Sequence, residues 1–103
     1  MSRNEKIAAY IGFSVKSGKI AYGYESVLAY RKKIYLVLCD SALSPNSLKK
    51  VERFVAEKSI KMRVITGLSE YFGGRLIKCA GFAEEHLAQA IDNELNNTVG
   101  GSN

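Results

Sequence analysis

The stretch IYLVLC at residues 34–39 is a continuous apolar run with the length of one β-strand. A strand with one face in water alternates apolar and polar residues, so an uninterrupted run indicates a strand that is covered on both faces. Asp40 and Ser41 end the run. We therefore expect these residues to form the central strand of a sheet with helices on each side.

Helical and extended patterns alternate on both sides of this strand. A capping box of Ser2 and Glu5 opens a first helix, which Gly18 ends, and Ser44 and Pro45 open another. Further helices are predicted over residues 25–31, 68–72 and 83–95. The other predicted strands cover residues 20–22, 61–65 and 75–80.

This order predicts an α/β protein, a three-layer α-β-α sandwich around a four-stranded mixed sheet. The short strand at residues 20–22 and the more alternating strand at 61–65 are expected at or near the edges. Residues 1–95 are expected to form a single domain. The polar, Gly-rich residues 96–103 predict a disordered tail.

The chain has 103 residues and a net charge of +5, and its charges are unevenly distributed. Residues 83–103 contain four acids and no Lys or Arg, so residues 1–82 hold all 15 basic residues against six acids. A basic body favours a polyanion as partner, with the acidic last helix kept away from it. The alternative is that the charge serves solubility alone.

The N-terminal residues lack a signal-peptide pattern, and no apolar run approaches the ~20 residues that span a bilayer. We therefore expect a cytoplasmic protein with no membrane partner. Cys39 and Cys79 lie in apolar runs and His86 stands alone, which predicts no metal site. Residues 12–19 have two glycines and a lysine but not the spacing of a phosphate-binding loop. We expect neither an enzyme nor a cofactor.

Residues 18–27 (GKIAYGYESV) form the segment that most suggests a binding function. Gly18 and Lys19 form a basic turn, and Gly23 opens the next helix, where free backbone N–H groups can hold a phosphate. Tyr24 is the tyrosine of this region expected to be exposed, and Lys32 adds long-range attraction. This edge is interpreted as facing RNA; the alternative is an ordinary strand-to-helix turn beside a solvated basic cluster.

Taken in order, these features resemble the L-seven-Ae/L-thirty-e family of ribosomal proteins, in its small bacterial branch. The resemblance runs from about residue 7 to residue 91, and its matching segments are residues 18–19, 23, 36–38, 44–50, 63–65 and 68–74. It implies a ribosomal or ribosome-associated protein that binds kink-turn or related RNA, ribosomal RNA being the expected partner. It also implies that RNA contacts the start of the second helix, the loop after the central strand and the loop before the last strand.

The motif of this family at its second helix is Gly-x-Asn-Glu-x-x-Lys, and this chain departs from it. Gly23 is kept, but Glu25 stands at the Asn position, Ser26 at the Glu position and Ala29 at the Lys position. A Glu carboxylate accepts hydrogen bonds but cannot donate them as Asn does. The loop before the last strand is expected to be short, at residues 73–75.

The residues predicted to contact RNA are Gly18, Lys19, Gly23, Tyr24, Glu25, Ser26, Lys32 and Arg75. The departures from the motif keep a second hypothesis open. In it, the same fold has lost kink-turn recognition and acts as a protein-interaction module or a homodimer.

Overall fold

The computed structural model describes residues 2–101, with side chains described through Asn96. The elements in chain order are α1 (Arg3–Ser17), β1 (Ile20–Tyr22), α2 (Tyr24–Ala29), β2 (Leu36–Asp40), α3 (Pro45–Lys58), β3 (Lys61–Ile65), the 3-10 helix η1 (Leu68–Phe72), β4 (Cys79–Phe82) and α4 (Glu85–Gly101). Among the described residues, no helix is long and apolar enough to cross a membrane.

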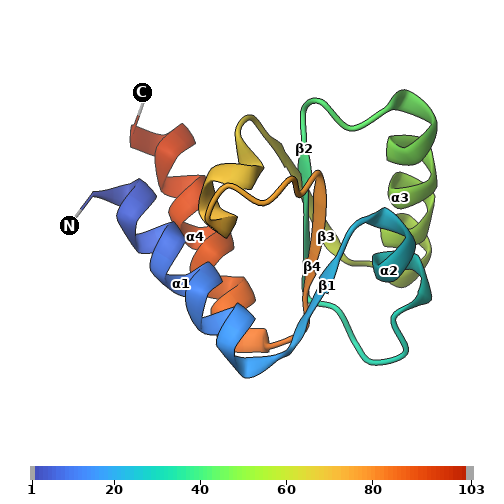
Figure 1. The fold of residues 1–103 in the computed structure, drawn as a ribbon, viewed down its shortest axis with the longest axis horizontal. Helices are drawn as coiled ribbons and strands as arrows, with labels where there is room; N and C mark the ends of the chain where they lie inside the picture. The colour runs from blue at the N-terminus through green and yellow to red at the C-terminus, as the bar shows by residue number, and fades with distance from the viewer. Residues whose placement is uncertain (1, 102–103) are drawn as a thin grey trace.

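The four strands form one mixed sheet between two layers of helices, so the predicted α-β-α sandwich is confirmed. The strand order is β1-β4-β2-β3; β2 pairs with β3 in parallel, and β4 runs antiparallel to β1 and β2. Helices α1 and α4 cover one face of the sheet, and α2 and α3 cover the other (Figure 1). The short β1 and the alternating β3 lie at the two edges, as expected.

The apolar run of β2 is explained by its position between two hydrophobic clusters. Leu36 and Leu38 belong to the cluster under α1 and α4, together with Ile7 of α1. Val37 and Cys39 belong to the cluster on the opposite face, under α2 and α3. The strand is therefore buried on both faces, and no position along it tolerates a polar side chain before Asp40.

The last strand begins later than the sequence indicates. We predicted a strand over residues 75–80, but β4 starts at Cys79. The reason is that Ile77 makes its backbone hydrogen bonds with a side chain: its N–H donates to Ser69 Oγ (2.8 Å), and its carbonyl accepts from the same hydroxyl (3.1 Å). Of residues 75–78, only Ile77 is buried. A buried apolar residue between exposed neighbours resembles the alternating pattern of a half-buried strand, so the sequence predicts a strand here. The loop before β4 therefore spans residues 73–78.

The last helix extends further than predicted. We placed its end at Leu95, whereas α4 continues to Gly101, and Asn96 accepts a hydrogen bond from Arg63 Nη2. Residues 102 and 103 of the predicted tail lie outside the described residues.

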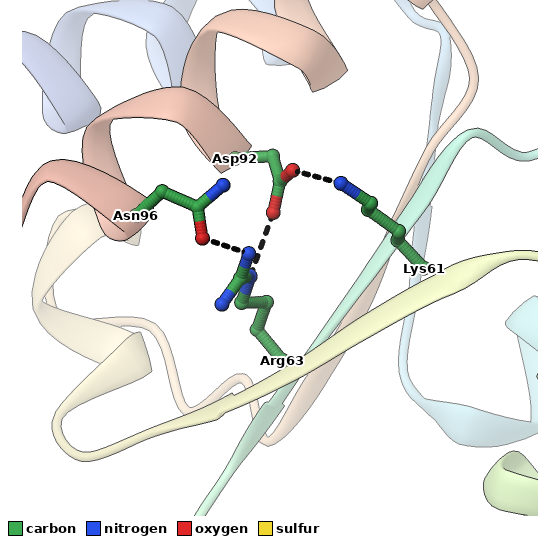
Figure 2. A network of polar contacts seen from close by, with 4 residues as sticks. All are labelled: Lys61, Arg63, Asp92 and Asn96. Atoms are coloured by element: carbon green, nitrogen blue, oxygen red, sulfur yellow. Dashed lines mark hydrogen bonds and ion pairs between the residues drawn. The ribbon is translucent and has the colours of Figure 1, made fainter. Parts of the chain in front are cut away.

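Helix α4 is joined to the edge strand β3 by a buried carboxylate (Figure 2). Asp92 Oδ1 accepts from Arg63 Nε at 2.6 Å, and Asp92 Oδ2 accepts from Lys61 Nζ at 2.9 Å. Burial alone raises the pKa of Asp92, but the hydrogen bonds and charges of Arg63 and Lys61 hold it below its ordinary value.

Two acids of α4 are thus partners of bases in the body; that this helix is kept away from a polyanion stays a prediction. Asp92 pairs with β3, and Glu94 pairs with Lys6 of α1 at 3.8 Å. The acidic helix neutralises bases on α1 and β3 and leaves the remaining bases of the body to face solvent.

We predict that Asp92→Asn lowers the free energy of unfolding at pH 7 by about 1–3 kcal/mol, because Arg63 and Lys61 lose their shared carboxylate. The pKa of Asp92 is lower in the folded state than in the unfolded state. Its contribution is therefore present above the ordinary pKa of 3.8 and disappears as the pH falls through the folded-state pKa. Urea unfolding of the unmodified protein and of the Asp92→Asn variant, at pH 7 and in acid, measures this difference in free energy and its pH dependence. The exposed Glu57→Gln is the control; an equal loss in both variants would contradict the assignment.

Candidate nucleic-acid interface

A groove of about 450 Å³ lies at the end of the sheet where β2 finishes and β4 begins. Three segments that are distant in sequence border it: the start of α2, the loop between β2 and α3, and the loop before β4. Its lining residues are Tyr22, Gly23, Tyr24, Glu25, Ser26, Leu43, Ser44, Ser47, Leu76, Lys78 and Cys79. We call this end of the molecule the groove end.

Asp40, the last residue of β2, fixes two of the loops at the groove end. Its Oδ1 accepts a hydrogen bond from the N–H of Ala42, and its Oδ2 accepts one from the N–H of Leu68, both at 2.8 Å. Its own N–H donates to the carbonyl of Lys78. The hydrogen bond from Ala42 is the main cause that lowers the pKa of Asp40, so the carboxylate is ionised at neutral pH.

Gly23 makes the turn from β1 into α2. Its φ of 84° and ψ of 153° lie in a region that only glycine occupies readily. Its N–H donates to the carbonyl of Cys79 (2.7 Å), and its carbonyl accepts from Val27 in the first turn of α2. No heavy atom lies within 4 Å of a Cβ built here, so the backbone conformation alone requires glycine.

The three residues after Gly23 present different chemistry to the groove. Glu25 and Ser26 are exposed. Tyr24 is half-buried, because it packs against the cluster under α2 and α3, which corrects the expectation that it is exposed. Lys50 of α3 places its Nζ 5.9 Å from the centre of the Tyr24 ring. Carboxylate, hydroxyl and aromatic groups therefore border the groove together.

The loop before β4 contributes residues that the sequence analysis missed. Leu76 is 80% exposed although it is apolar, and it lines the groove beside the exposed Lys78. The predicted Arg75 lies next to them and stacks its guanidinium on the ring of Tyr22, 4.9 Å from the centroid. The late start of β4 explains the omission, since Leu76 and Lys78 were assigned to a strand.

The structure divides the predicted contact residues between two ends of the sheet. The groove is lined by Gly23, Tyr24, Glu25 and Ser26. Arg75 lies beside the groove, because its guanidinium stacks on the ring of Tyr22, which lines it. The remaining three predicted residues, Gly18, Lys19 and Lys32, line a separate hollow. The carbonyl of Lys19 accepts from Ala83 after β4, whereas Gly23 bonds to Cys79 at the start of β4. The extended segment between them separates the two ends by about 13 Å.

Within residues 2–101, no group of three or more His, Cys, Asp or Glu residues could hold a metal ion. Cys39 and Cys79 are free, buried and directly opposite each other on β2 and β4, with their Sγ atoms 3.9 Å apart. The hydrogen bond with Cys39 and burial raise the pKa of the Cys79 thiol, and the same hydrogen bond lowers the pKa of Cys39.

No protein-family model matches the chain, and no curated protein matches it. Among solved structures, a protein with unknown function from Bacillus halodurans C is similar, with a TM-score of 0.80. The match covers 88% of this chain and 97% of that one, at 16% sequence identity. The similarity therefore shows the fold alone.

We predict opposite effects for two Gly→Ala substitutions. Neither Gly12 nor Gly23 has a neighbour within 4 Å of an added Cβ, so the comparison isolates backbone conformation. Gly23→Ala should lower the free energy of unfolding by about 1–3 kcal/mol, because of its positive φ. Gly12→Ala, inside α1, should raise it by about 0.5–1 kcal/mol. Chemical denaturation measures both, and equal effects of the two would contradict the role given to Gly23.

Proposed function

We propose that this chain is an RNA-binding protein, without catalytic activity, that recognises structured RNA of the kink-turn type through its groove end. One observation carries the proposal. The three segments that the family resemblance implies as RNA contacts meet around a single groove. The loop before β4, residues 73–78, contributes lining residues directly. We also propose that the protein acts in the cytoplasm on ribosomal RNA.

The groove end has the chemistry that unpaired bases require. RNA-binding proteins recognise sequence mainly in bulges and loops, where bases leave the helix and expose their faces and edges. The exposed Leu76 would pack against the face of such a base. Glu25 would accept hydrogen bonds from base amino groups, and Ser26 could donate or accept. These contacts depend on a kink that presents unpaired bases.

Basic side chains around the groove would position the RNA backbone. Lys78 lines the groove, Lys50 lies over Tyr24, and Arg75 is held against Tyr22. Lys78 and Glu25 are the base and the acid among the lining residues, and Lys50 and Arg75 lie beside them. Phosphate contacts fix register and orientation, whereas base contacts specify the site. The groove offers both kinds of group.

A homodimer is the second candidate, and one observation favours it. Strand β3 is an edge strand, and its Val64 is 49% exposed. Pairing of two β3 strands would cover this side chain and extend the sheet. However, the Lys61 side chain on the same strand remains 66% exposed although it pairs with Asp92. Charged residues on edge strands commonly oppose such pairing. We therefore favour RNA binding.

The proposal is tested by fluorescence anisotropy with a labelled kink-turn RNA and an unkinked duplex of equal length, at low and moderate salt. We expect tighter binding to the kinked RNA, and a preference that persists as salt rises. Equal affinities that both vanish with salt would overturn the proposal. A salt-resistant dimer without RNA affinity would support the homodimer instead.

We predict that Ala29→Lys increases affinity for the kinked RNA. Ala29 is the exposed last residue of α2 and stands where the family motif has its phosphate-binding Lys. One added phosphate contact should steepen the dependence of log K on log salt by about 0.9. Ala8→Lys, at an exposed position of α1, adds the same charge away from the groove and is the control. Equal gains in both variants would mean that net charge alone acts.

A further inference from the structure

The end of the sheet opposite the groove carries a second basic surface, which we call the basic end. It consists of Lys19 before β1, Lys58 at the end of α3, and Arg31, Lys32 and Lys33 between α2 and β2. Antiparallel pairing of β4 places this end beside Phe82 and Ala83, whereas the groove lies beside Cys79. The two surfaces share no lining residue.

The basic end is hollowed rather than convex. Two hollows, of about 740 Å³ and 450 Å³, lie on either side of the segment between α2 and β2. Both are lined by Tyr30, Lys32, Lys33 and Tyr35. A cylindrical polymer could therefore contact the segment along its length, with positive charge on both sides of it.

The charges of the basic end are not neutralised by the protein. All five basic side chains are exposed, and in the described part of the chain none has a carboxylate within 4 Å. Glu57 is the acid among the residues that line the two hollows. Unpaired bases in such excess create a positive potential that attracts a polyanion.

Aromatic rings lie among these bases. Lys33 Nζ is 4.9 Å from the centre of the Tyr35 ring, and Lys58 Nζ is 5.7 Å from that of Phe54. These contacts hold the ammonium groups over ring faces. Lysine and arginine interleaved with aromatics are typical of surfaces that follow a nucleic-acid backbone. The residues exposed here include no large hydrophobic side chain of the kind that inserts into a lipid surface; those lie at Phe13, Val15, Val64 and Leu76.

We infer that the basic end is a second RNA-contacting surface, which binds the phosphate backbone of structured RNA independently of the groove. The choice of RNA as the polyanion rests on the proposed function. The separation of the two surfaces does not, since it follows from strand register. The basic end supplies affinity without sequence preference, and the groove supplies recognition of the kink.

The test removes three positive charges, from the basic end in one variant and from outside both surfaces in a control. One variant carries Arg31→Gln, Lys32→Gln and Lys33→Gln. Its control carries Arg3→Gln, Lys49→Gln and Arg53→Gln, three exposed bases outside both surfaces, so the two variants have the same net charge. Both are titrated by anisotropy with the kink-turn RNA and with the unkinked duplex over a range of salt. Thermal unfolding verifies that each variant is folded.

We expect the basic-end variant to lose roughly tenfold in affinity for both RNAs at low salt. Its salt dependence should flatten by about 0.9 for each phosphate that the variant no longer neutralises. Its ratio of kinked to unkinked affinity should stay that of the unmodified protein, and the control should lose much less. Equal losses in the two variants would overturn the inference. So would loss of binding to anionic phospholipid vesicles with RNA affinity unchanged, which would assign the surface to membranes.

The same titrations separate this inference from the proposed function. If the unmodified protein shows no preference for kinked RNA, the groove proposal fails. A loss of RNA affinity in the basic-end variant that the control does not share would still support the second surface. If the preference is present but both variants bind alike, the groove proposal stands and the second surface is refuted.

Discussion

Burial of β2 on both faces is the constraint on which the rest of the structure depends. Its side chains alternate between two apolar clusters, so helices must cover the sheet on each side, and neither face is free to bind a partner. Polar loops are therefore confined to the two ends of the sheet, where the chain enters and leaves the strands (Figure 1). Both proposed contact surfaces lie at these ends for that reason.

The two ends of the sheet differ in chemistry, and each suits a different kind of contact with RNA. The groove end combines a protruding apolar side chain, Leu76, with the carboxylate of Glu25 and the hydroxyl of Ser26, groups suited to base faces and edges. The basic end presents lysine and arginine without partnering acids in the described region, a composition suited to phosphates. Asp40 stabilises the groove through its hydrogen bonds with Ala42 and with the carbonyl of Lys78, while Asp92 pairs with two bases of β3.

Much of the fold could be predicted because its signals are local. The caps at Ser2 and Ser44, the glycine at the end of α1 and the apolar run of β2 each depend on nearby residues. The start of β4 could not be predicted, because the side chain of Ser69, eight residues earlier in η1, takes the backbone hydrogen bonds of Ile77. The candidate site was only partly predicted for a related reason. Lys19 and Gly23 are close in sequence, but the pairing of β1 with β4 carries them to opposite ends of the sheet.

The most direct test of the central claim is a map of backbone amide chemical shifts of the isotope-labelled protein, recorded by nuclear magnetic resonance as kink-turn RNA is added. The account predicts that the largest shift changes fall at residues 23–26 and 76–78, which meet at the groove, with smaller and salt-sensitive changes at residues 31–33. Unchanged shifts at residues 23–26 and 76–78, with changes confined to the faces of α1 and α4, would contradict it.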